Sequence, residues 1–85
     1  NDPIATAAML YLFDHDVRVP DEVRIVGFNG FEAHRYARPR LTTVDSAAYQ
    51  LGEQAGRAML ERLESGRFAR GEYILPVHFD AGATT

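Results

Sequence analysis

The side chains that could perform catalysis do not form a catalytic arrangement. The run Asp14-His15-Asp16 has the residue types of a metal or acid–base site, but three adjacent side chains at a helix end point in different directions. Its histidine instead complements the negative end of a helix dipole. Ser46 and Ser65 lack a nucleophile elbow, and His34 and His78 have no partner at ligand spacing. We therefore predict no enzyme activity, no metal site and no cofactor.

Asn29 and Gly30 are better candidates for a functional role. They follow an apolar run that ends at Phe28, and Asn-Gly is a strong turn signal because both residues tolerate positive φ. A hairpin would need a second strand at once, which residues 31–38 do not resemble. In an open parallel sheet, ligands bind beyond the carboxyl ends of the strands, where Asn29 would stand. Asn1 is placed equivalently before the first predicted helix, and it is either a ligand contact or a helix cap.

The hydrophobic pattern predicts two helices and three extended segments that would position these residues. The expected order is a helix over 3–15 capped by Asp2, a strand over 22–28, a loop over 30–40 with one helical turn, an extended segment over 41–44, a helix over 46–64 capped by Asp45 or Ser46, and a strand over 73–79. The strand at 22–28 is almost continuously apolar, which is typical of parallel strands buried on both faces. We predict an α/β fold whose parallel sheet is flanked by helices.

Composition limits the class of protein. The 85 residues have a net charge of −3, and that charge argues against a polyanion bound by this chain alone, although Arg35, Arg38 and Arg40 lie close together. The longest apolar run is too short to span a bilayer, and the N-terminus does not resemble a secretion signal. With no cysteine, the chain has no disulfides and is compatible with a cytoplasmic location. Two or three strands cannot cover two helices, so we expect a fragment of a larger α/β domain.

Several short motifs occur in an order and spacing that resemble one family. They are Asn1-Asp2, Val19-Pro20-Asp21, Ile25-Val26-Gly27-Phe28, Leu41-Thr42-Thr43-Val44 after Pro39, Leu51-Gly52 with Ala55, Leu75-Pro76-Val77 and Thr84-Thr85. Together they resemble the last third of a lactose-repressor/galactose-repressor (LacI/GalR) transcription regulator. The resemblance implies a two-lobed, periplasmic-binding-protein-like (type I) effector domain. It assigns residues 1–44 and 77–85 to the C-terminal lobe and 45–76 to the N-terminal lobe.

The resemblance also implies partners. Effectors of this family bind between the lobes, at positions that match Asn1 and Asn29. The family usually has aspartate where this chain has Asn29, and loss of that charge favours a sugar acid such as a gluconate-like molecule over a neutral sugar. Gly82 stands where the family often has arginine, which puts the usual C-terminal strand contacts in doubt.

The family forms homodimers through its C-terminal lobe and binds operator DNA through a helix-turn-helix headpiece that lies outside these residues. Dimer contacts would then fall on the first helix and on the loop before Pro39. The positions concerned are Ala5, Ala8, Met9 and Leu12 on the helix, with His34 and Tyr36 in the loop. The alternative function is that of a periplasmic sugar-binding protein of the same fold.

Overall fold

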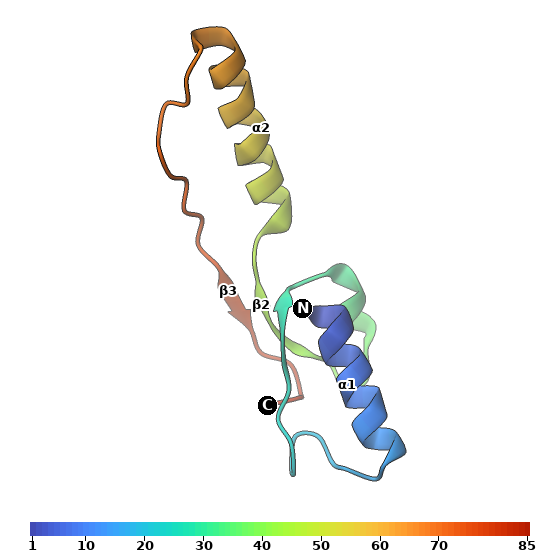
Figure 1. The fold of residues 1–85 in the computed structure, drawn as a ribbon. Helices are drawn as coiled ribbons and strands as arrows, with labels where there is room; N and C mark the ends of the chain where they lie inside the picture. Colours follow the sequence, from blue (N-terminus) through green and yellow to red (C-terminus); the bar gives the residue numbers. More distant parts are fainter.

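The protein consists of a small α/β body and a long arm (Figure 1). The computed structural model describes the backbone of residues 1–85 and every side chain except those of Ala33 and His34. The body, residues 1–45 and 78–85, contains helix α1 (Asp2–Asp14), strand β1 (Val26–Asn29), the 3-10 helix η1 (Glu32–Tyr36), strand β2 (Thr42–Asp45) and strand β3 (His78–Asp80). The arm, residues 46–77, contains helix α2 (Ala48–Ser65) and the segment that returns from it.

Helix α1 is capped by Asn1 rather than by the predicted Asp2. The Asn1 side-chain oxygen accepts a hydrogen bond from the Ile4 N–H (3.1 Å), and Pro3 occupies the first turn, where no N–H donor is needed. At the other end, just beyond the helix, Asp16 takes the left-handed conformation (φ 58°) that commonly ends a helix. Asp2 was therefore wrongly predicted as the cap, because its carboxylate points into the body.

Helix α2 starts without the side-chain cap that was predicted at Asp45 or Ser46. Its N-cap residue is Ala47, in a left-handed conformation (φ 52°), and Asp45 Oδ1 accepts from the Ala47 N–H at 2.8 Å. Asp45 thus fixes the turn before the helix and does not cap it. The helix ends at Ser65, one residue beyond the predicted 64, where Gly66 is left-handed (φ 82°) and its N–H donates to the Arg62 carbonyl at 2.9 Å.

The sheet is mixed, which corrects the prediction of a parallel sheet. Strands β1 and β2 pair in parallel with Asn29 opposite Asp45, whereas β2 and β3 are antiparallel. The reason lies in the arm: the chain leaves β2, runs outward along α2, turns at Gly66 and comes straight back beside β2 (Figure 1). The predicted strand at 73–79 forms only at its end, because residues before His78 lie beyond the reach of β2.

The core of the body lies where the last residues of the chain close on β2. Leu41, Thr42 and Thr84 are fully buried. The Thr42 N–H donates to Thr84 Oγ1 (2.9 Å), and the Thr84 hydroxyl donates to the Ile25 carbonyl (2.7 Å). These bonds join the C-terminus to the segment before β1. They satisfy buried backbone groups that would otherwise destabilise the fold.

Gly82 belongs to this closure. A Cβ at this position would meet the Arg40 carbonyl oxygen and would come within 2.7 Å of the Leu41 carbonyl carbon. Its N–H donates to Thr42 Oγ1 at 3.0 Å. No side chain fits this close approach of two backbones, so glycine is required here. The Arg40 guanidinium lies beside it and bonds Asp80 at 3.0 Å.

The arm is not packed as a globular unit. The radius of gyration is 17.5 Å, whereas a compact chain of this length would have about 12 Å. Helix α2 has an apolar face, but only Ala58 on it is buried, and Leu51, Met59 and Leu63 are exposed. Strand β1 is also open, since Val26 and Phe28 are about half exposed rather than covered on both faces. Both surfaces are of the kind that needs a further layer of structure.

Candidate binding site at the ends of β1 and β2

The carboxyl ends of β1 and β2 meet at one edge of the body and line a hollow of about 590 Å³. Asn29 and Asp45 are register partners there, each the last residue of its strand. The hollow is lined by Asn29 to Glu32, Asp45, Ala47 to Gln50, Leu75, Pro76 and His78. These residues come from the two strands, the start of α2 and the returning segment. The position agrees with the rule that ligands bind beyond the carboxyl ends of parallel strands.

The backbone at Asn29 makes the turn that shapes this edge. Asn29 has a φ of 107°, and its carbonyl oxygen accepts from the N–H (3.2 Å) and the hydroxyl (3.4 Å) of Ser46. Gly30 follows with a φ of 74°, and a Cβ there would come within 2.8 Å of the Asp45 carboxyl carbon. The turn and ligand interpretations of Asn29-Gly30 are thus compatible. The backbone forms the turn, and the half-buried Asn29 side chain belongs to the lining.

Asn1 caps helix α1, which is one of its two predicted roles, and its contact with a ligand stays a prediction. Its side-chain oxygen bonds the first turn of α1, and Asn1 is not among the residues that line the hollow. The neighbouring Asp2 reaches this region instead. Its Oδ2 accepts from the N–H of Phe31, a lining residue, at 2.8 Å.

Sequence reasoning missed several lining residues. Asp45 was interpreted as a helix cap, although the rule that selected Asn29 also selects the last residue of the neighbouring parallel strand. Glu32, Gln50 and His78 come from three other segments, and no local motif marks them.

The charge of the hollow is set by acidic side chains. Glu32 and Asp45 contribute carboxylates, and among the described lining residues there is no arginine and His78 is the one titratable base. Carboxylate and amide oxygens accept hydrogen bonds from hydroxyl groups. A negatively charged ligand would instead be repelled by the two carboxylates. The hollow is therefore suited to a neutral ligand rich in hydroxyl groups.

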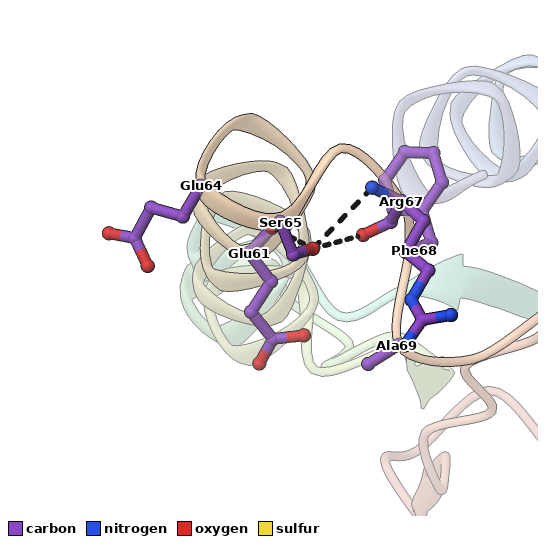
Figure 2. A pocket seen from close by; sticks show the side chains of 6 residues that line it. All are labelled: Glu61, Glu64, Ser65, Arg67, Phe68 and Ala69. Atoms are coloured by element: carbon purple, nitrogen blue, oxygen red, sulfur yellow. Dashed lines mark hydrogen bonds between the residues drawn. The ribbon is translucent and has the colours of Figure 1, made fainter.

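A second hollow of about 740 Å³ lies at the far end of α2, away from the strands (Figure 2). It is formed by the turn that ends the helix. The Ser65 hydroxyl lies 2.6 Å from the Glu61 carbonyl and 2.9 Å from the Arg67 carbonyl. All six of its lining residues are exposed, and the Glu61 and Glu64 carboxylates point away from Ser65. We interpret it as the open concave side of a helix-ending turn.

The first helix does not present the predicted dimer residues as one surface. Met9 is 1% exposed and Ala5 is also buried, because both pack in the body. Buried side chains offer little surface to a partner, so the burial of Ala5 and Met9 argues against these two predictions. Ala8 is exposed and Leu12 is half-buried.

The exposed apolar face of α1 is a different one. It contains Ile4, Ala8 and Tyr11, spaced three or four residues apart, and the ring of His15 stacks on Tyr11 at 4.3 Å. We call Ile4, Ala8, Tyr11 and His15 the outer face of α1. Tyr36 in η1 is 73% exposed, as a contact residue would be, and the His34 side chain lies outside the described part of the structure.

Comparison with known proteins identifies the family. The profile of the periplasmic binding protein-like domain matches residues 1–85, the whole chain. The chain belongs to this family, in its LacI-type branch. This confirms the α/β architecture and the family resemblance seen in the sequence motifs.

The LacI-type chain is similar to several named repressors. It is 36% identical over 63 residues to the HTH-type transcriptional repressor PurR of Haemophilus influenzae (strain PittEE). This alignment covers 74% of the chain and 19% of PurR. It is 31% identical over 85 residues to the ribose operon repressor of Halalkalibacterium halodurans. This alignment covers all of the chain and 26% of the ribose operon repressor. The chain therefore spans about a fifth to a quarter of these relatives. Both relatives are named as repressors.

Solved structures of LacI-type regulators superpose on the whole chain. A LacI transcriptional regulator from Bacillus cereus subsp. cytotoxis NVH 391-98 matches with a TM-score of 0.94 at 30% identity, over 30% of its own length. The lac repressor dimer bound to operator and the anti-inducer ONPF matches with a TM-score of 0.89 at 29% identity, over 29% of its own length. A LacI family regulator from Enterococcus faecium with bound ribose matches with a TM-score of 0.83 at 26% identity, over 32% of its own length.

Two further findings concern metals and membranes. Within the described side chains, no group of three or more histidine, aspartate or glutamate residues is arranged to hold a metal ion. No helix in the described part of the chain is long and apolar enough to cross a membrane.

Proposed function

We propose that this LacI-type chain forms one wall of the effector site in a dimeric, sugar-responsive transcription regulator. The observation that carries the proposal is the hollow where Asn29 and Asp45 end neighbouring parallel strands. Two structural relatives support it, because one contains ribose and another an anti-inducer together with its operator.

The effector we propose is a neutral sugar. The sequence alone favoured a sugar acid, because asparagine replaces the usual aspartate at Asn29. The structure, however, puts Glu32 and Asp45 in the same lining, without an arginine to balance them. Two carboxylates make a sugar acid the less favourable ligand, whereas sugar hydroxyls can donate to both of them. The loss of charge at Asn29 is thus offset by its neighbours.

The arm belongs, in this proposal, to the other lobe of the effector domain. Residues 1–44 and 77–85 would form part of the C-terminal lobe, and residues 45–76 part of the N-terminal lobe. The exposed apolar face of α2 supports this division, since such a face is stable only when a further layer covers it. The two crossings between lobes would then lie beside the hollow, at Asp45 and Pro76.

The regulator would bind operator DNA through a helix-turn-helix headpiece outside these residues and act in the cytoplasm. Effector binding between the lobes would change their closure and, through it, the affinity for DNA. A periplasmic sugar-binding protein is the alternative. The regulator is favoured because the named relatives are repressors.

We propose the outer face of α1, with Tyr36, as the dimer contact. Replacing Tyr11 by glutamate should convert the dimer to a monomer, because Tyr11 is 65% exposed in the single chain and a charge there would be desolvated in the dimer. We expect the dimer dissociation constant to rise about a hundredfold or more. Sedimentation velocity of the regulator measures it. The variant Tyr11→Phe keeps the ring and should remain dimeric, and a dimeric Tyr11→Glu protein would rule out this face.

Calorimetric titration of the regulator with ribose, galactose, cellobiose and gluconate tests the proposed function. We expect saturable binding of at least one neutral sugar and none of gluconate. The variant Asn29→Gly removes the amide but accepts the positive φ, so the turn survives. It should weaken sugar binding about tenfold, as expected when a ligand hydroxyl loses its partner. Binding of gluconate alone would contradict the neutral-sugar proposal, and no binding at all would contradict the function.

A further inference from the structure

Asp2 is the most deeply buried charged residue among the described side chains, with 3% of its surface exposed. It is the first residue of α1, yet its carboxylate bonds two other elements. Oδ2 accepts from the Phe31 N–H at 2.8 Å, and Oδ1 accepts from the Thr43 hydroxyl at 2.5 Å. One side chain thus joins α1, the segment after β1 and strand β2.

The space around this carboxylate is shaped to admit it. A Cβ on Gly27 would meet Asp2 Oδ1 and would lie 2.9 Å from a methyl group of Leu41. Gly27 therefore lets the carboxylate approach β1 closely. Thr43 is fully buried, so its hydroxyl is held in place beside Oδ1. Charge-assisted hydrogen bonds in such a water-poor setting are strong and directional.

The two ends of this connection face the two functional surfaces. Phe31 lines the hollow, and its N–H is one of the groups that Asp2 holds. Asp2 also starts the helix whose opposite side carries Ile4 and Tyr11. A ligand that shifts Phe31 must therefore stretch this bond or move the N-terminus of α1 with it.

We infer that Asp2 is a positioning residue that couples effector binding in the hollow to the outer face of α1. The inference rests on the proposed function, since it needs an effector and a dimer. Helix α1 is one continuous element of 13 residues, so a movement of its first turn is transmitted along its length. Because coupling between two binding sites is reciprocal, sugar should change the affinity between subunits, and dimer formation should change the affinity for sugar by the same factor.

The test measures the dimer dissociation constant of the regulator with and without the neutral sugar that binds most tightly in the titration. We expect sugar to change that constant about fivefold or more in the wild type. In Asp2→Asn the amide can accept only one of the two bonds. The ratio of the two constants should then fall to about one, while sugar binding and dimer formation are retained. A purely structural role would lower stability, sugar binding and dimerisation together and leave the ratio unchanged.

Thr43→Val provides a second test if Asp2→Asn fails to fold. It removes the hydroxyl that holds Oδ1 and should also reduce the ratio, whereas Thr43→Ser keeps a hydroxyl and should preserve it. A wild type that binds sugar with no change in dimer affinity would overturn the inference and leave the proposed function standing. A ratio unchanged in both Asp2→Asn and Thr43→Val would overturn it as well. If no sugar binds the wild type, the proposed function fails, and the coupling inference fails with it.

Discussion

Replacing Met9 by glutamate is expected to unfold the body rather than to separate two subunits. Met9 is 1% exposed and lies on the face of α1 that packs into the body. A carboxylate at this position would lose its hydration without gaining a partner, and the thioether contacts would be lost too. We expect a loss of about 3 to 5 kcal/mol in the free energy of unfolding. Urea unfolding of a regulator that carries the variant measures the loss.

The matched control is Met9→Leu, which keeps an apolar side chain of similar volume and should cost less than about 1.5 kcal/mol. The alternative outcome follows from the sequence-based prediction that Met9 is a dimer contact. In that case Met9→Glu would give a monomer of nearly normal stability. Such a monomer would contradict the packing of α1 described above.

Replacing Gly27 by alanine is expected to cause the second large loss of stability. The added Cβ would occupy the space of Asp2 Oδ1 and press on Leu41. Since β1 is fixed by its pairing with β2, the carboxylate would have to leave its position beside Phe31 and Thr43. The cost combines overpacking with two buried hydrogen bonds, about 2 to 4 kcal/mol in the free energy of unfolding.

The same substitution at Gly56 is the matched control. Gly56 lies inside α2, and apart from its chain neighbours and the adjoining helix backbone no atom of the described residues lies within 4 Å of the position that an alanine Cβ would occupy there. Alanine also favours the helix, by up to about 1 kcal/mol relative to glycine. In urea unfolding we expect Gly27→Ala to lower the free energy of unfolding and Gly56→Ala to raise it. A Gly27→Ala protein as stable as the wild type would contradict the close approach of Asp2 to β1.

The sequence predicted the elements whose signals are local. Helix α1 and helix α2 lie within one or two residues of their expected bounds, and the helical turn after Gly30 is present as η1. The ion pair between Glu53 and Arg57, 2.7 Å apart, is local in the same sense, since its spacing is that of neighbouring helix turns. Asn29 was placed at the end of its strand for the same kind of reason, because an apolar run stops there.

The remaining features depend on contacts between distant residues. The direction of β3 is set by the return of the arm, and only the three-dimensional path of that segment determines it. The exchange of roles between Asn1 and Asp2 depends on Phe31 and Thr43, which are 29 and 41 residues away from Asp2. Met9 was assigned to a surface because helical spacing shows that an apolar stripe exists. Spacing does not show which partner the stripe packs against.

The central claim is that the edge formed by Asn29 and Asp45 is the wall of an effector site. A crystal structure of the regulator, grown with the neutral sugar that binds most tightly in the titration, tests it most directly. We predict sugar hydroxyl groups within hydrogen-bonding distance of the Asn29 side chain and of Asp45, with Phe31 against the sugar. A sugar bound elsewhere, with the hollow between Asn29 and Asp45 filled only by water, would contradict the account.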